Sequence, residues 1–157
     1  MSAQRLSQWL RLWWPALVWA AAIASFSTDA FSGEHTSHII LPLLHWLFPA
    51  ALPETLELMH HLIRKAGHVS EYFVLSLLLW HSVRAGRSGW RPEWAVTVVA
   101  ISAGWAALDE LHQAFVPSRG AAMTDVLIDV CGAVTGQLLI LAFHAIRSRR
   151  PVAAATQ

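Results

Sequence analysis

Four long apolar stretches constrain the fold more than any other feature of this sequence. They lie at about residues 9–27, 62–83, 94–116 and 124–143. Each is close to the roughly 20 residues that a helix needs to cross the hydrocarbon core of a bilayer. Charged residues make up 13% of the chain, against about 25% in soluble domains, which is too few to cover a water-soluble surface. We therefore expect an all-α membrane protein, a four-transmembrane-helix bundle forming one domain over residues 1–157.

The first stretch also fits a secretory signal peptide, with a small-residue cleavage site at residues 22–24. Its length and the apolar stretches that follow favour a membrane span instead. After it, the sequence predicts an extracytoplasmic loop from residue 29 to residue 53, which contains Asp29, Glu34, His35 and His38. Within the loop, residues 39–52 are apolar but too short, and too interrupted by Pro42 and Pro49, to span. We expect this segment to be re-entrant or interfacial.

Basic residues predict the orientation of the bundle. With four spans, both termini and the turn after the second span lie on one side. That side holds eight of the eleven Lys and Arg residues, namely Arg5, Arg11, Arg84, Arg87, Arg91, Arg147, Arg149 and Arg150. The other side holds only Arg64, Lys65 and Arg119. The positive-inside rule then places the N- and C-termini in the cytoplasm of a bacterial inner membrane.

Ionisable residues gather near the extracytoplasmic ends of the last three spans. The second span carries Lys65, His68, Glu71 and Tyr72, the third Asp109, Glu110, His112 and Gln113, and the fourth Asp125 and Asp129. Spacings of three and four residues put most of each set on one helix face, with His112 beside Asp109 and Gln113. The fourth span also has the small-residue pair Gly132 and Gly136, which permits close helix approach. We expect these residues to meet at one depth.

Ionised side chains at the bilayer centre cost about 2.5–3.5 kcal/mol each on insertion scales, so several together need a reason. One explanation is structural: Arg64, Lys65, Arg119 and histidines neutralise the carboxylates and hold the helices in register. The other explanation is a polar site for a ligand or a reaction.

The sequence leaves three kinds of chemistry open for such a site. Lys65, His68 and Arg119 could receive a phosphate or carboxylate. A histidine beside a carboxylate could act as a general acid or base. The candidate catalytic residues are His68, Glu71, Asp109, Glu110 and His112. The nitrogen and oxygen donors would also suit a divalent cation, although their spacings are not diagnostic of metal binding, and no cofactor is predicted.

Several function classes lose support. The net charge of +1 gives no global field for a nucleic-acid partner. Cys131 is the single cysteine, so no intrachain disulfide and no paired-cysteine zinc site can form. The sequence contains no GxSxG, HExxH or Walker pattern.

Three motifs carry a resemblance to a known family. They are RKAGHVSEY at 64–72, DELHQAFVPSRG at 109–120, and D-x3-D-x2-G-x3-G at 125–136, with FSTD after the first span. Together they resemble the VanZ-like family of small multi-pass membrane proteins. Asp129 stands where many members have Asn. The motif positions that carry over as ligand-binding candidates are Lys65, His68, Glu71, Tyr72, Asp109, Glu110, His112, Gln113, Arg119, Asp125 and Asp129.

The resemblance implies a cell-envelope protein whose founding member is linked to low-level teicoplanin resistance, and other members lie beside envelope polysaccharide genes. It implies no catalytic role for any residue. Our leading hypothesis is binding of an anionic lipid or polysaccharide-lipid headgroup in an outward-facing polar cavity. The alternatives are an enzyme that hydrolyses or transfers a phosphoryl or glycosyl group, and a structural scaffold bundle.

Overall fold

The computed structural model describes residues 3–29, 32–116 and 122–149. Within these ranges the chain forms five helices and no strand: α1 (Ala3–Phe26), α2 (Gly33–Leu47), α3 (Pro53–Arg84), α4 (Pro92–Gln113) and α5 (Met123–Ser148). The predicted all-α class is confirmed.

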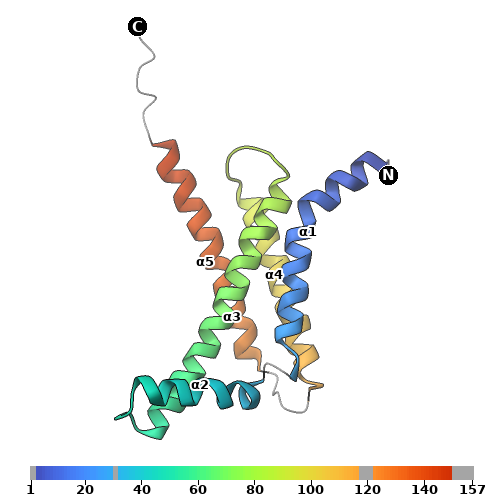
Figure 1. Ribbon diagram of the computed structural model, residues 1–157. Coiled ribbons are helices and arrows are strands. Elements are labelled where there is room, and N and C mark those ends of the chain that lie inside the picture. Colours follow the sequence, from blue (N-terminus) through green and yellow to red (C-terminus); the bar gives the residue numbers. More distant parts are fainter. Residues whose placement is uncertain (1–2, 30–31, 117–121, 150–157) are drawn as a thin grey trace.

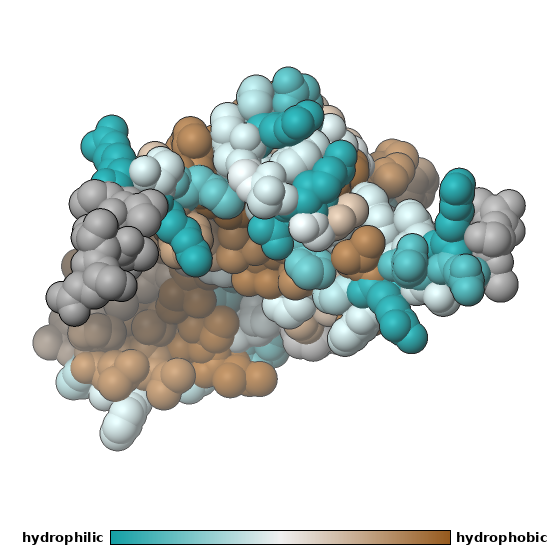
Figure 2. Space-filling model, turned by 90° about the horizontal axis from the view of Figure 1, so that it is seen from above, coloured by the Kyte–Doolittle hydropathy of each residue, from teal (hydrophilic) through white to brown (hydrophobic). Residues whose placement is uncertain are grey.

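Four of these helices form a bundle, and α2 lies across one end of it (Figure 1). α3 is the central helix, because it packs against each of the other four. The start of α1, the end of α5 and the turn between α3 and α4 all lie at the end opposite α2, although α1 and α5 splay apart there. We call the two ends the termini end and the α2 end. Seen from the termini end, hydrophilic residues gather over the helix ends, with hydrophobic residues exposed beside them (Figure 2).

Proline and glycine mark the boundaries of α3 and α4. Pro53 and Pro92 occupy the first turns of these helices, where the missing N–H costs no hydrogen bond. Beyond the end of α3, Ala85 has a φ of 50°, and Gly86 and Gly89 also have positive φ. Such left-handed residues stop a helix and let the chain reverse over a short turn.

Two of the described helices, α4 and α5, are long and apolar enough to cross a membrane. α3 carries Arg64, Lys65 and Glu71 within its length, and α1 carries Arg11. These charges lower the mean hydropathy of both helices. Length and composition alone therefore identify only α4 and α5, of the described helices, as candidate membrane spans.

The prediction of a loop around residues 34–38 is wrong. α2 begins at Gly33 and continues through Pro42 to Leu47, so Glu34, His35 and His38 are helical. The Ser32 hydroxyl caps this helix by accepting the backbone N–H of His35 at 3.3 Å. Pro42 lies inside this helix, where packing against α3 offsets its disruption of the helix.

The closest helix contact lies where α3 and α5 cross. A Cβ atom added at Gly132 would lie 2.4 Å from the carbonyl oxygen of Val69, and one at Gly136 would lie 2.9 Å from the hydroxyl of Ser76. No larger residue fits there without a shift of backbone, as the spacing of the two glycines predicts. The polar side of this crossing faces the α2 end, where the candidate site lies.

Candidate functional site

Two polar contacts join α3 to α5 on the α2 side of the crossing. Lys65 pairs with Asp125 in the first turn of α5, and one turn further on His68 Nδ1 lies 3.2 Å from Asp129 Oδ1. Asp129 is fully buried, and the His68 side chain is mostly buried. Helical spacing explains the match, because residues 65 and 68 on α3 face residues 125 and 129 on α5, each pair about one turn apart.

A third polar contact joins α1 to α4. The Ser27 hydroxyl donates to Asp109 Oδ2 at 2.6 Å, and Gln113 Nε2 donates to the same oxygen at 2.9 Å. All three side chains are buried. A buried carboxylate needs donors of this kind, since its desolvation is otherwise uncompensated.

The buried Glu110 closes the connection between α4 and α5. Its Oε2 accepts the backbone N–H of Ala122, the residue before α5, at 2.8 Å. A carboxylate at this position also interacts favourably with the positive end of the α5 dipole. Glu110 thus fixes where the last helix begins.

Three buried oxygen atoms in this region have no hydrogen-bond partner among the described residues. They are Tyr72 Oη, Glu110 Oε1 and Asp129 Oδ2. Tyr72 is fully buried in α3, about one helical turn after His68. Buried polar atoms are normally satisfied, so unpaired ones in one neighbourhood point to a functional centre.

A cavity of about 270 Å³ opens beside these groups, between α1, α2 and α3. Its polar lining comes from Arg64, His68, Glu71 and Ser27, and its apolar lining from Phe26, Ile40 and Ile63. The guanidinium of Arg64 packs against Gly33, the first residue of α2. Arg64 makes no ion pair with any residue that the structure describes. A cation therefore stands at the positive end of a helix, an arrangement that favours an anion.

The structure brings most of the candidate residues together. Those that make hydrogen bonds or charged contacts in the cluster are Lys65, His68, Asp109, Glu110, Gln113, Asp125 and Asp129. Tyr72 is buried in the same part of α3, and Glu71 is half-buried and lines the cavity. His112 is exposed and lines, together with Asp109, a second space of about 430 Å³ between α1 and α4. Arg119 lies outside the described residues.

His112 and Asp109 line the same space, but their side chains differ in burial. The buried face of this part of α4 consists of Ala106, Asp109, Glu110 and Gln113. The exposed His112 lies on the flank of that face, beside Asp109.

Two residues of the site were not among the sequence candidates. Ser27 belongs to the FSTD motif, and Arg64 directly precedes Lys65. Both signals were present in the sequence, but neither shows that Ser27 bonds Asp109 or that Arg64, rather than Lys65, lines the cavity.

No group of three His, Cys, Asp or Glu side chains suited to a metal ion occurs in residues 3–29, 32–116 and 122–149. The side chains of His68 and Asp129 instead form a pair, as do those of Lys65 and Asp125.

The fold and this cluster define a class: an all-helical membrane protein with paired and unpaired carboxylates buried at one end of its bundle. The chain belongs to the VanZ/LLP1 family, whose model matches residues 6–144 and so includes nearly all of the five helices. The resemblance seen in the sequence motifs is thereby confirmed. Comparisons with curated proteins and with solved structures gave no match.

Proposed function

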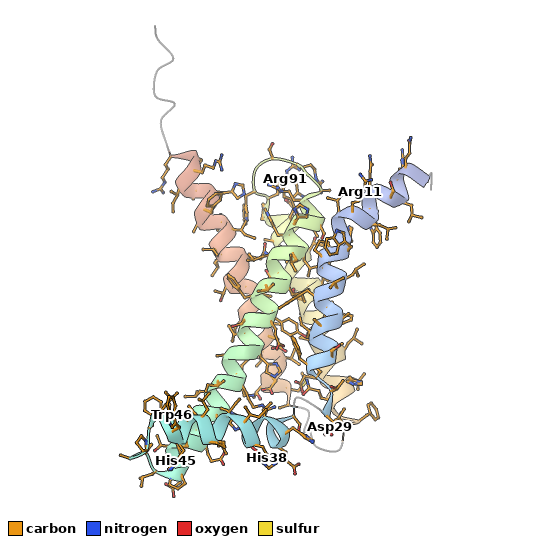
Figure 3. The ribbon with its side chains drawn as sticks, viewed as in Figure 1. Arg11, Asp29, His38, His45, Trp46 and Arg91 are labelled. Carbon is orange, nitrogen blue, oxygen red and sulfur yellow. The ribbon has the colours of Figure 1, made fainter. Side chains whose placement is uncertain are left out.

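We propose that the chain is a multi-pass protein of the bacterial inner membrane, with α1, α3, α4 and α5 as four spans and both termini in the cytoplasm. The arrangement of helix ends supports this, since an even number of crossings returns the chain to the side where it began. The labelled Arg11 and Arg91 lie at the termini end, and Asp29 lies at the α2 end (Figure 3). The positive-inside rule favours this orientation.

In this arrangement α2 is an interfacial helix on the outer surface. Ile39, Leu43 and Trp46 are large, apolar and exposed on one side of the helix. His38 and His45 lie at the edge facing away from the bundle, and Trp46 lies at the edge nearer to it (Figure 3). A helix with an exposed apolar side and a polar side suits the boundary between headgroups and acyl chains.

The function that this geometry supports best is binding of an anionic lipid or polysaccharide-lipid headgroup in the cavity between α1, α2 and α3. The observation that carries the proposal is Arg64, a cation without an ion-pair partner among the described residues, in a cavity that also has apolar walls. Arg64 would bind the phosphate and His68 would donate to it, while Phe26, Ile40 and Ile63 contact the first carbons of the lipid chain.

The contacts also assign different roles to the two cations of the RK pair. Lys65 is held by Asp125, so it positions α5 against α3, and Arg64 is the residue left to bind an anion. Arg119 keeps its expected role as a second anion contact on sequence grounds alone.

Binding is tested with farnesyl phosphate, a short polyprenyl phosphate, added to the purified full chain in detergent. Arg64→Gln removes a charged hydrogen bond and should weaken binding about 10-fold or more. Arg91→Gln is the matched control, because Arg91 lies at the termini end with its guanidinium over the Trp94 ring. Unchanged affinity in Arg64→Gln, or equal binding of uncharged farnesol, would contradict the proposal.

A second candidate is an enzyme that hydrolyses or transfers a phosphoryl or glycosyl group, and one observation favours it. Asp129 orients the imidazole of His68 through Nδ1, and a carboxylate that orients a histidine is a common element of acid–base catalysis. His68→Gln and Asp129→Asn would both abolish release of inorganic phosphate from farnesyl pyrophosphate. Absence of any phosphate release by the wild-type chain would leave binding as the function.

Glycopeptide resistance and a scaffolding role have less support in the geometry. Family membership alone carries the first proposal, which predicts that cells expressing the chain tolerate more teicoplanin than cells expressing Arg64→Gln. If the chain were only a scaffold, cells expressing the wild-type chain and cells expressing Arg64→Gln would tolerate teicoplanin equally. Arg64→Gln would then have no effect that depends on a ligand.

A further inference from the structure

A groove separates α3 from α5 at the termini end, far from the cavity described above. The two helices are in contact at Gly132 and Gly136 and diverge from there toward the end of α5 (Figure 1). The space between them has a volume of about 380 Å³. Trp80, Leu139 and Phe143 form its apolar walls, and His81, Arg84 and His144 supply its polar groups.

The polar groups of this groove are all basic. Arg84 makes no ion pair with any described residue, and its Nε is buried without a hydrogen-bond partner among them. None of the described residues that line the groove is acidic. A guanidinium N–H that is withdrawn from water without an acceptor is unfavourable, and a ligand oxygen would remove that cost. Arg147, whose guanidinium lies 5.9 Å from the Phe143 ring, adds charge nearby.

We propose that this groove binds an anionic phospholipid from the leaflet at the termini end. The phosphate lies against Arg84 with His81 and His144 beside it, and one acyl chain lies between Trp80, Leu139 and Phe143. The inference rests on the membrane topology proposed above and is independent of what the outer cavity binds. Basic pockets between membrane helices are recurrent sites for anionic lipids.

The charge of the groove favours an anionic lipid over an apolar helix of another protein. A helix packed against Arg84 would leave the guanidinium without an acceptor, whereas a lipid phosphate supplies one. The uniform basic charge distinguishes an anionic lipid from phosphatidylcholine, whose ammonium group would meet only cations here.

The test is native mass spectrometry of the purified full chain with dioleoyl phosphatidylglycerol or dioleoyl phosphatidylcholine added. The wild-type chain should retain phosphatidylglycerol about 10-fold more tightly, the difference expected for one charged hydrogen bond. Arg84→Gln should reduce this preference to near unity. Leu139→Trp, which fills the groove with a larger apolar side chain, should weaken binding of phosphatidylglycerol without removing the charge. Arg91→Gln, at the same end but outside the groove, should behave as wild type.

Three results would overturn the proposal. Equal losses in Arg84→Gln and Arg91→Gln would mean that general surface charge binds the lipid. Loss of phosphatidylglycerol in Arg64→Gln, with binding retained in Arg84→Gln, would assign this lipid to the outer cavity. A stable dimer that does not bind phosphatidylglycerol would assign the groove to a second copy of the chain. Failure of the outer cavity to bind farnesyl phosphate would leave this inference untouched.

Discussion

At the scale of single residues, the stability of the bundle depends on hydrogen bonds to buried carboxylates. Ser27→Ala removes one of the two side-chain donors to Asp109 and should lower the free energy of unfolding by about 1–3 kcal/mol. Thermal unfolding in mild detergent measures the change. Ser25→Ala is the control, because the exposed Ser25 hydroxyl bonds only the Ala21 carbonyl. A similar effect of both substitutions would show that the Ser27–Asp109 contact is not a stabilising one.

Close packing at Gly132 gives a second prediction. Gly132→Ala places a methyl group against the backbone of Val69 and should destabilise the protein by about 1–3 kcal/mol. Gly104→Ala, where the added carbon meets nothing within 4 Å, should be neutral or stabilising by up to about 1 kcal/mol. Thermal unfolding of the two variants side by side distinguishes packing from helix propensity. Equal stabilities would contradict the tight crossing of α3 and α5.

Which residues are buried and polar could be predicted from the sequence, but their partners could not. Asp125 and Asp129 were placed on one face by helical spacing, and their pairing with Lys65 and His68 depends on the rotation of α5 against α3. The same dependence explains why His112 lies beside Asp109 and is nevertheless exposed. Spacing gives a face within one helix, whereas the direction of that face is fixed only when neighbouring helices pack.

At the scale of elements, the contact between α2 and α3 should depend on pH. His60 is buried in the first part of α3, before the proposed membrane span, and Thr36 Oγ1 lies 3.3 Å from its Nε2. Burial and the charge of Arg64 lower the pKa of His60 from its usual 6.5, although Glu57 opposes this. The contact is therefore fully stable above about pH 6.5 and weakens as the pH falls below that value, because the unfolded chain binds a proton more readily.

Hydrogen exchange of the α2 amides measures this effect. Exchange should accelerate between pH 7 and pH 5.5 after correction for the intrinsic rate. His60→Gln should exchange at a rate that does not change with pH, and His38→Gln, at an exposed position of α2, should respond as wild type. Slower exchange at low pH would contradict the assignment of a buried neutral histidine.

The positions of the helices could be predicted where the apolar stretches are long. The spans predicted at about 62–83, 94–116 and 124–143 coincide in large part with α3, α4 and α5. α2 was not predicted as a helix because Pro42 interrupts a short apolar run in its sequence. Its stability comes from the Ser32 cap and from packing against α3. Tertiary contacts of this kind leave no local signal.

In the whole molecule, the two ends of the bundle have different chemistry. The α2 end has buried carboxylates and the cavity of Arg64, and the termini end has the basic groove of Arg84. Family membership and the helical class were accessible from motifs and composition. The groove was not, because it arises from the angle between α3 and α5.

Accessibility of single cysteines to a membrane-impermeant thiol reagent tests the central claim most directly. In a Cys131→Ala background, His38→Cys on α2 should react in intact cells. Ser88→Cys, between α3 and α4, and Ser148→Cys, at the end of α5, should react only after the membrane is opened. These results would establish four spans with the polar site at the outer surface. Reaction of Ser88→Cys or Ser148→Cys in intact cells, or protection of His38→Cys until lysis, would contradict it.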